Sequence, residues 1–138
     1  MRMEYVEAVL ELVGLIPPGS AVSYGDVAEL LGSGGPRQVG SVMSHHGSSV
    51  AWWRVLRASG AAPDGHEADA LRQYLSEDTP LRGNPEEYLR NGESSWRVDL
   101  RVARWQPSDA DFDRIEALAE GLATASRKLS EGNDGMTE

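Results

Sequence analysis

The stretch that decides the fold reads SYGDVAELLGSGGPRQVGSVMSHH and occupies residues 23–46. Ser23, followed three positions later by Asp26, forms a capping box, which predicts a helix that runs to about Leu31. Four small residues then predict a turn, and the proline after them suits the first position of a second helix, which runs to about His45. Two short helices joined by a glycine-rich turn are typical of the helix-turn-helix.

The second of these helices carries polar groups on its outer side. Its apolar residues recur at helical spacing and are expected to face the core. The polar residues between them stay outward: Arg37, Gln38, Ser41, Ser44 and His45. A short helix with such a surface can enter a groove of DNA. The same pattern also fits a plain helical hairpin in a protein core, and the pattern by itself leaves both interpretations open.

Helical patterns also flank this unit. Apolar residues recur at helical spacing in the segments Met3–Leu15 and Glu67–Leu75. Ser108 is expected to cap an amphipathic helix that runs to about Leu129. Asn84–Leu89 is expected to form a short capped helix. These segments make helices the main elements of the fold.

Two segments predict extended chain. Trp52–Leu56 is a short apolar run, and Trp96–Trp105 alternates apolar and charged residues, which is typical of one β-strand with a solvent-facing side. The fold is therefore expected to be mainly α with minor β. We expect a winged-helix-like helix-turn-helix DNA-binding domain at 3–82, a C-terminal extension of a strand and an amphipathic helix at 83–130, and a disordered tail at 131–138.

The composition excludes several classes of site. The chain has no cysteine, which excludes disulfides, thiolate metal sites and thiol nucleophiles. Its histidines, His45, His46 and His66, do not match a zinc spacing, and we expect no metal and no cofactor. No apolar run approaches the roughly 18 residues that span a bilayer. The first residues also lack the apolar stretch of a signal peptide, so we expect no membrane contact and a cytoplasmic location.

The net charge of −9 opposes contact with nucleic acid, since phosphate-binding proteins usually carry a basic surface. The distribution of charge weakens that objection. Residues 1–60 hold 4 basic and 5 acidic residues, whereas residues 107–138 hold 3 and 8. A protein that holds DNA weakly and recognises one base is compatible with this pattern, and a strong non-specific DNA-coating protein is not.

Four motifs in order resemble the C-terminal domain of the O6-alkylguanine-DNA alkyltransferases. Ile16–Ala28 resembles the opening of that domain, and Arg37–Met43 matches its Arg-x-Val-Gly-x-x-Met. Ala51–Val55 falls on the family's Pro-Cys-His-Arg-Val, and Leu75–Leu81 resembles its closing Leu-x-x-Glu-Gly-x-x-Leu. The resemblance covers roughly residues 5–81. Each motif is weak alone, and their order and spacing make the resemblance specific.

The departures from the family pattern predict a protein that transfers no alkyl group. The nucleophilic cysteine falls on Trp52, and an indole cannot accept an alkyl group by displacement as a thiolate does. The histidine that would activate the thiol falls on Trp53, whose side chain has no hydrogen-bond acceptor. The family's asparagine after the recognition helix falls on His46. A tryptophan in place of the cysteine is typical of the alkyltransferase-like proteins, which resemble the enzymes in binding O6-alkylguanine in DNA.

The resemblance gives roles to four side chains. Arg37 matches the arginine that fills the space left by a flipped base, and Tyr24 matches the tyrosine that crowds the 3′ phosphate. Trp52 offers a flat ring against which an alkylated base can pack, with Trp53 as its neighbour. The alternatives are a surface arginine, a core tyrosine and tryptophans that only fill the core.

The remaining candidates contact DNA through the backbone or through small polar groups. The backbone carbonyls of Trp52 and Val55 match those that accept from the guanine amine in the family. Ser41, Ser44 and His45 are candidates for phosphate contacts, and a merely solvated helix face is the alternative for these three.

The leading interpretation is a non-enzymatic DNA-damage sensor. Its expected partners are double-stranded DNA that contains O6-alkylguanine, which it would bind by nucleotide flipping, and the nucleotide-excision repair proteins that would receive the lesion. The protein is expected to act as a monomer. The alternative is a protein-interaction or regulatory module on the same fold without lesion binding, which the acidic charge and the C-terminal extension favour.

Overall fold

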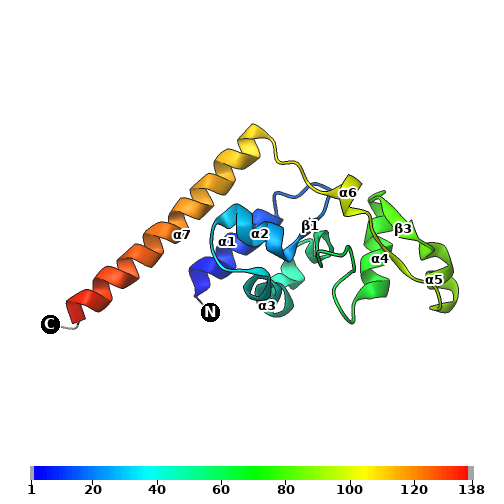
Figure 1. The fold of residues 1–138 in the computed structure, drawn as a ribbon, viewed down its shortest axis with the longest axis horizontal. Helices are drawn as coiled ribbons and strands as arrows, with labels where there is room; N and C mark the ends of the chain where they lie inside the picture. Colours follow the sequence, from blue (N-terminus) through cyan, green and yellow to red (C-terminus); the bar gives the residue numbers. More distant parts are fainter. Residues whose placement is uncertain (1, 137–138) are drawn as a thin grey trace.

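The computed structural model describes residues 2–136. Its helices form two groups on either side of a short central strand pair (Figure 1). One group contains α1 (Met3–Val13), α2 (Tyr24–Leu31) and α3 (Pro36–His46), and α4 (Glu67–Ser76) stands in the other. The predicted mainly α fold with minor β structure is confirmed.

The helix-turn-helix forms where the sequence predicts it. The N–H of Asp26 donates to Oγ of Ser23 at 3.0 Å, and the N–H of Ser23 donates back to the Asp26 carboxylate at 2.9 Å. α2 ends at Gly32, whose φ of +65° is the left-handed conformation that favours glycine. α3 then begins at Pro36, and its valines bury against α2 and α1.

The central strand pair joins two distant parts of the chain. β1 (Val22–Ser23) lies parallel to β2 (Val55–Leu56). The chain reaches β2 through two 3₁₀ turns, η1 (Gly47–Ser49) and η2 (Trp52–Arg54). The prediction that residues 52–56 are extended is therefore wrong for the first three of them. A 3₁₀ turn spaces successive side chains by about a third of a circle, and this lets the two tryptophans reach different surroundings.

A second strand pair lies beyond α4. β3 (Leu81–Gly83) pairs antiparallel with β4 (Trp96–Val98), and α5 (Pro85–Asn91) connects them. The predicted strand over residues 96–105 is wrong after Val98, because the chain turns into the short helix α6 (Leu100–Ala103).

The segment after β4 is tied back to the helix-turn-helix side of the molecule. The N–H of Ala21 donates to the carbonyl of Ala103 at 2.9 Å, and the N–H of Trp105 donates to the carbonyl of Ala21 at 2.9 Å. Trp105 is only 6% exposed and packs in the core around α1 and α2. Arg104 forms an ion pair with Asp26 of the capping box. The extension is thus part of the packed core.

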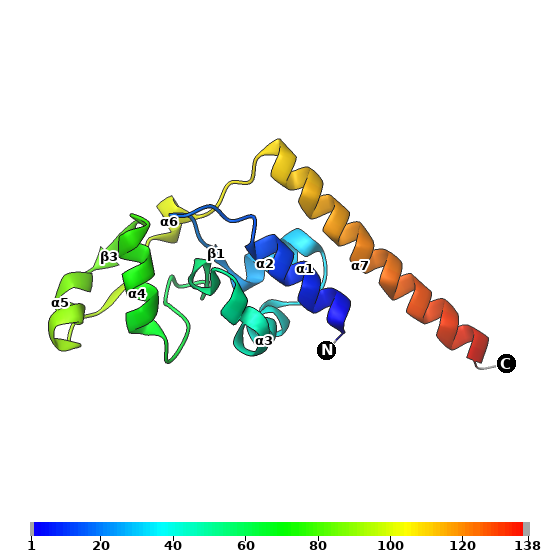
Figure 2. The same ribbon diagram turned by 180° about the vertical axis from the view of Figure 1, so that it is seen from behind.

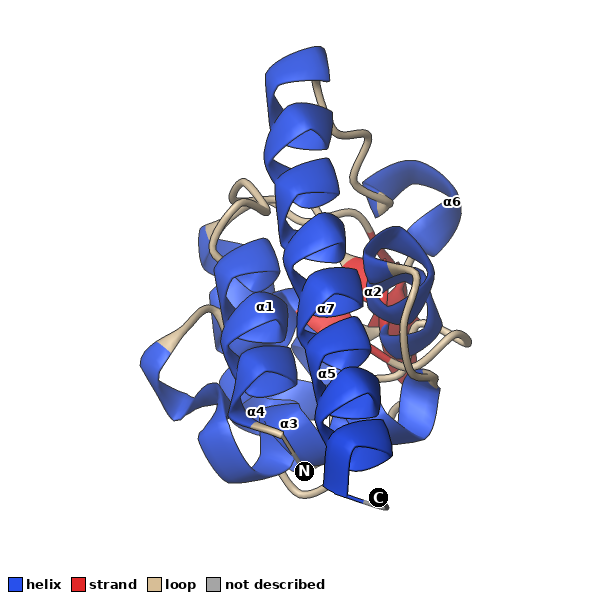
Figure 3. Cartoon of the chain, turned by 90° about the vertical axis from the view of Figure 1, so that its left-hand side faces the viewer, coloured by secondary structure: helices blue, strands red, loops and turns tan. Residues whose placement is uncertain are grey.

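α7 (Asp109–Met136) is the longest helix and runs alongside α1 and α2 (Figures 2 and 3). Ser108 caps it as predicted, since its Oγ accepts from the N–H of Asp111 at 3.1 Å. Ile115 and Leu122 are buried against the first core. The helix continues to Met136, where the sequence predicted a disordered tail from residue 131, and residues 137 and 138 lie outside the described residues.

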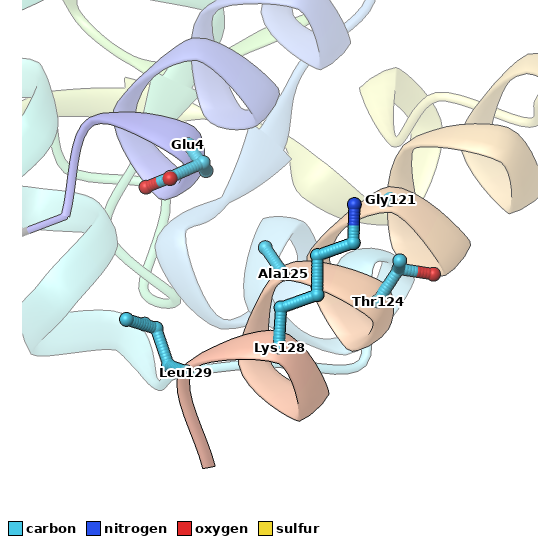
Figure 4. Close-up of a pocket in the computed structure, with 6 residues that line it drawn as sticks. All are labelled: Glu4, Gly121, Thr124, Ala125, Lys128 and Leu129. Carbon is cyan, nitrogen blue, oxygen red and sulfur yellow. The ribbon is translucent and has the colours of Figure 1, made fainter. Parts of the chain in front are cut away.

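A cavity of about 530 Å³ lies between the first turn of α1 and the second half of α7 (Figure 4). Its lining residues are Glu4, Gly121, Thr124, Ala125, Lys128 and Leu129. None of the residues predicted to contact DNA lines this cavity.

Candidate nucleic-acid interface

A second pocket, of about 610 Å³, opens beside the C-terminal half of α3. Residues from several separate segments line it: Tyr24, Gly40, Met43, Ser44, Gly47, Ser48, Trp52, Arg57, Pro63, Asp64, His66 and Asp69. Three of the predicted site residues therefore meet here, namely Tyr24, Ser44 and Trp52. The others lie around it or behind it.

Tyr24 is positioned by the capping box of α2. As the first residue of that helix it directly follows the capping Ser23, so its backbone is fixed by the cap. Its half-buried side chain lines the pocket. Burial raises the pKa of the Tyr24 hydroxyl. The charge of Arg57 lowers this pKa by a smaller amount, and the charge of Asp64 raises it. The hydroxyl therefore keeps its proton at neutral pH and can donate a hydrogen bond to an anion.

Arg37 lies on the exposed surface of α3, one position after Pro36. Its guanidinium has no hydrogen-bond or ion-pair partner among the side chains that the structure describes, those of residues 2–129. Gly40 and Ser44 follow at spacings of three and seven, so they share a helix face with Arg37. Because both of these residues line the pocket, Arg37 stands on the helix face that leads into it.

Ser41 and His45 lie on α3 but outside the pocket lining. Nδ1 of His45 lies 2.8 Å from the carbonyl oxygen of Ser41. A carbonyl only accepts, so Nδ1 of His45 is the donor in this contact. The hydroxyl of Ser44 also donates to the Ser41 carbonyl, at 3.3 Å. These three polar side chains form one small network on the surface of α3.

The two tryptophans have different surroundings. The ring of Trp52 lines the pocket, with the ring of His66 at 5.5 Å between centroids. The Trp53 ring stands edge-on to that of Trp52, at 5.6 Å, and its N–H donates to Oε1 of Glu77 at 3.0 Å. Trp53 therefore does not line the pocket, and its ring instead packs edge-on against that of Trp52.

Glu77 accepts hydrogen bonds from three residues in two parts of the chain, Trp53 and Arg54 in η2 and Gly19 before β1. Arg54 donates to it from Nη2 at 2.5 Å and from Nε at 3.2 Å, and the N–H of Gly19 donates at 3.2 Å. Burial raises the pKa of Glu77, but the bonds from Arg54, Gly19 and Trp53 outweigh burial and lower it overall. Glu77 is thus a carboxylate that fixes η2 and the turn before β1.

The indole of Trp53 cannot serve as a base toward the neighbouring position. Its single N–H is committed to Glu77, and the indole offers no acceptor. Its backbone carbonyl accepts from the hydroxyl of Tyr74 at 2.5 Å. Both contacts hold the residue in place, and neither provides a route for a proton.

Val55 is fully buried in β2, and its side chain does not reach the pocket. Its backbone N–H donates to the carbonyl of Trp52 and closes the 3₁₀ turn. The carbonyl of Trp52, which the resemblance pairs with the guanine amine, thus already has one donor and keeps a second lone pair for another.

Sequence reasoning missed the residues that close the other side of the pocket. Arg57, Asp64, His66 and Asp69 come from the loop after β2 and from the start of α4. The available signal was the run Pro63–Gly65, which predicts a tight turn between two packed segments. Among the described residues, no group of three or more metal-binding side chains gathers here or elsewhere.

A helix-turn-helix whose outer helix borders a tryptophan-lined pocket is the arrangement that the resemblance implies. The family model of the DNA-binding domain of 6-O-methylguanine DNA methyltransferase matches residues 4–79. The chain belongs to this family. The resemblance to the alkyltransferase-like branch is confirmed by its relatives.

Three relatives illustrate the similarity. The DNA base-flipping protein of Escherichia coli (strain K12) is 33% identical over 106 residues, which are 73% of this chain and 74% of that protein. The DNA base-flipping protein of Vibrio parahaemolyticus is 26% identical over 108 residues, which are 75% of this chain and 98% of that protein. S. pombe Atl1, solved in complex with damaged DNA containing O6-carboxymethylguanine, has a TM-score of 0.63 at 23% identity. That likeness covers 78% of this chain and 99% of Atl1, and it shows a common fold.

From residue 2 to residue 136, no helix combines the length and the apolar character needed to cross a membrane.

Proposed function

We propose that this protein binds O6-alkylguanine in double-stranded DNA by turning the damaged nucleotide out of the duplex into the pocket beside α3. The observation that carries the proposal is the convergence of Tyr24 and Trp52 on one pocket of about 610 Å³, with Arg37 on the helix face that leads into it. The relatives named DNA base-flipping protein, and Atl1 bound to damaged DNA, support the proposal.

The energetics favour a damaged base over an intact one. Alkylation at O6 removes the N1 hydrogen of guanine and weakens its pairing with cytosine, so extrusion costs less than the usual few kcal/mol. Stacking on the ring of Trp52 stabilises the extruded base by about 1–3 kcal/mol. Arg37 fills the space that the base leaves, and the protonated hydroxyl of Tyr24 donates to the neighbouring phosphate.

The protein leaves the alkyl group where it is. Trp52 occupies the position of the alkyl acceptor, the chain holds no cysteine, and Trp53 directs its N–H to Glu77. A bound lesion that is not repaired needs a further repair system, and we propose that the monomeric protein presents it to nucleotide-excision repair proteins.

The test is a titration of two labelled duplexes of the same sequence, one with a single O6-methylguanine. Fluorescence anisotropy at low and moderate salt separates lesion preference from general attraction to phosphate. We expect tighter binding of the damaged duplex at every salt concentration. Equal affinity for the two duplexes would overturn the proposal.

A second candidate is a protein-interaction module that has lost DNA binding. It is favoured by the net charge of −9 and by α7, which leaves Phe112 45% exposed in an acidic first turn that contains Asp109 and Asp111. The same titration distinguishes the two, because such a module binds neither duplex.

A further inference from the structure

One rim of the pocket is closed by an ion pair that the proposed function does not use. The guanidinium of Arg57, just after β2, pairs with the carboxylate of Asp64 in the following loop. Both residues line the pocket. Their side chains are 49% and 76% exposed, so solvent and ligands reach both charges.

The loop holds Asp64 at its tip. The N–H of His66 donates to the carbonyl of Pro63 at 3.2 Å and closes a turn, in which Gly65 adopts a φ of +81°. The base of the loop is anchored, since Ala62 is 6% exposed in the core. A fixed base with an exposed tip lets the Asp64 side chain move away without disturbing the core.

Among residues 2–129, whose side chains the structure describes, Arg57 is the one arginine or lysine that lines the pocket. It also lies near the group that is proposed to meet DNA. Burial raises the pKa of the Tyr24 hydroxyl, the charge of Arg57 lowers it, and the charge of Asp64 raises it. Both charges are therefore close enough to act on this hydroxyl, which the proposed function places at a phosphate.

We propose that Arg57 is a second contact to the DNA backbone and that Asp64 masks it until a phosphate of the duplex displaces the carboxylate. This inference rests on the proposed function. A carboxylate and a phosphate bind the same fork of guanidinium donors, so they compete for Arg57. An exposed ion pair contributes little to stability, so its exchange for a phosphate is not opposed by the fold. Masking weakens attraction to every duplex and leaves recognition of the base to the pocket.

The alternative is that the ion pair only holds the loop against the domain. The two roles predict opposite effects of Asp64→Asn. If Asp64 masks Arg57, the variant frees the guanidinium and tightens DNA binding. If Asp64 holds the loop, the variant loosens the rim of the pocket and binding weakens or stays unchanged.

The test compares Arg57→Ala and Asp64→Asn with the control Arg72→Ala. Arg72 also forms an exposed ion pair, with Asp69 at 3.2 Å. Asp69 lines the pocket but Arg72 does not, so Arg72→Ala controls for the loss of one positive charge near the pocket without the loss of a pocket-lining guanidinium. Each full-length variant is titrated with an undamaged duplex and with a duplex that contains O6-methylguanine. Circular dichroism verifies folding, and Arg57→Lys, which keeps the charge and loses the fork, serves as a second variant.

Arg57→Ala is expected to weaken binding of both duplexes by the same factor, and Asp64→Asn to tighten binding of both. One phosphate contact contributes about −0.9 to the slope of log K against log salt concentration. The ratio of the wild-type affinity to that of Arg57→Ala should therefore fall about 3.5-fold between about 50 and about 200 mM salt. Arg57→Lys should fall between wild type and Arg57→Ala. Arg72→Ala should weaken binding less than Arg57→Ala, because it removes a charge near the pocket without removing a contact to a phosphate.

Two results would overturn the inference: an Asp64→Asn variant that binds no more tightly than wild type, or equal losses in Arg57→Ala and Arg72→Ala. The ratio of affinities for the two duplexes tests the proposed function separately. A wild-type protein without lesion preference refutes that function, while the shifts on the undamaged duplex still decide whether Asp64 masks Arg57.

Discussion

Replacing Trp105 by alanine is expected to destabilise the whole protein, although the residue lies well beyond the family match at residues 4–79. Its side chain is 6% exposed and packs in the core around α1 and α2. A tryptophan buries about 150–250 Å², which corresponds to about 4–6 kcal/mol at about 25 cal/mol per Å². Measured truncations of large aromatic residues cost about 3–5 kcal/mol, and we expect a loss of that size.

The measurement is urea unfolding followed by far-ultraviolet circular dichroism, which does not depend on the number of tryptophans. The matched control is Val102→Ala, because Val102 lies on the neighbouring α6 and is 68% exposed. The control should change the free energy of unfolding by less than about 0.5 kcal/mol. A loss below about 1 kcal/mol in Trp105→Ala would refute the assignment of Trp105 to the core.

The same reasoning predicts the fate of a protein that ends at Leu81. It would lack Trp105 and also Val98 and Leu100, which pack in the second core beside Leu56. Many domains have only about 5–15 kcal/mol of stability, so these losses should leave the remainder unfolded. A cooperative unfolding transition of the truncated chain would contradict this.

Three further predictions concern the site. Arg37→Ala should keep the fold and weaken binding of the damaged duplex by about 1–3 kcal/mol, and unchanged anisotropy titrations would remove Arg37 from the interface. Trp52→Cys should accept no labelled methyl group from DNA, because Trp53 cannot activate the thiol, and fast transfer of label to this variant would refute that reasoning. Glu77 has a lowered pKa in the folded state, so its contribution to stability is present above the unfolded pKa and is lost as pH falls through the folded value. Wild type should therefore lose more unfolding free energy than Glu77→Gln between neutral and acid pH, and parallel pH profiles would contradict this.

The helix-turn-helix could be predicted because its signals are local. Ser23 and Asp26 lie three residues apart and cap α2 through each other, and Pro36 starts α3 without help from the rest of the chain. Buried positions such as Val39 and Val42 follow the helical period. Local geometry and tertiary packing agree here, so the pattern is sufficient.

The prediction of a strand over residues 96–105 was wrong after Val98 for a local reason, which the alternation of apolar residues does not reveal. Apolar residues alternate as far as Val102, but the carboxylate of Asp99 accepts from the N–H of Arg101 at 3.2 Å and starts a helical turn. Val102 consequently faces solvent. The chain follows the cap of Asp99 and not the alternation of its apolar residues.

The pocket could be predicted only in part, because its walls come from segments that the sequence does not connect. The family motifs led to Tyr24 and Trp52. Nothing in the pattern indicates that Asp64 and His66 lie opposite them, since these residues belong to a loop whose position depends on Ala62 in the core. Likewise, the turn at residues 52–54 could not be predicted from the segment itself, because Trp53 and Arg54 donate hydrogen bonds to Glu77, which lies outside it.

The hydrogen bonds of Ala21 with residues 103 and 105 also limit how early this part of the fold can be completed during synthesis. The segment that leads into β1 is made early, but its partners follow 82 residues later in the chain. At about 5–20 residues per second, translation takes about 4–16 s to cover that distance. Until then Asp26 has no Arg104, and the core lacks the ring of Trp105. A nascent chain therefore carries the complete helix-turn-helix sequence before it has the residues that complete the core around it.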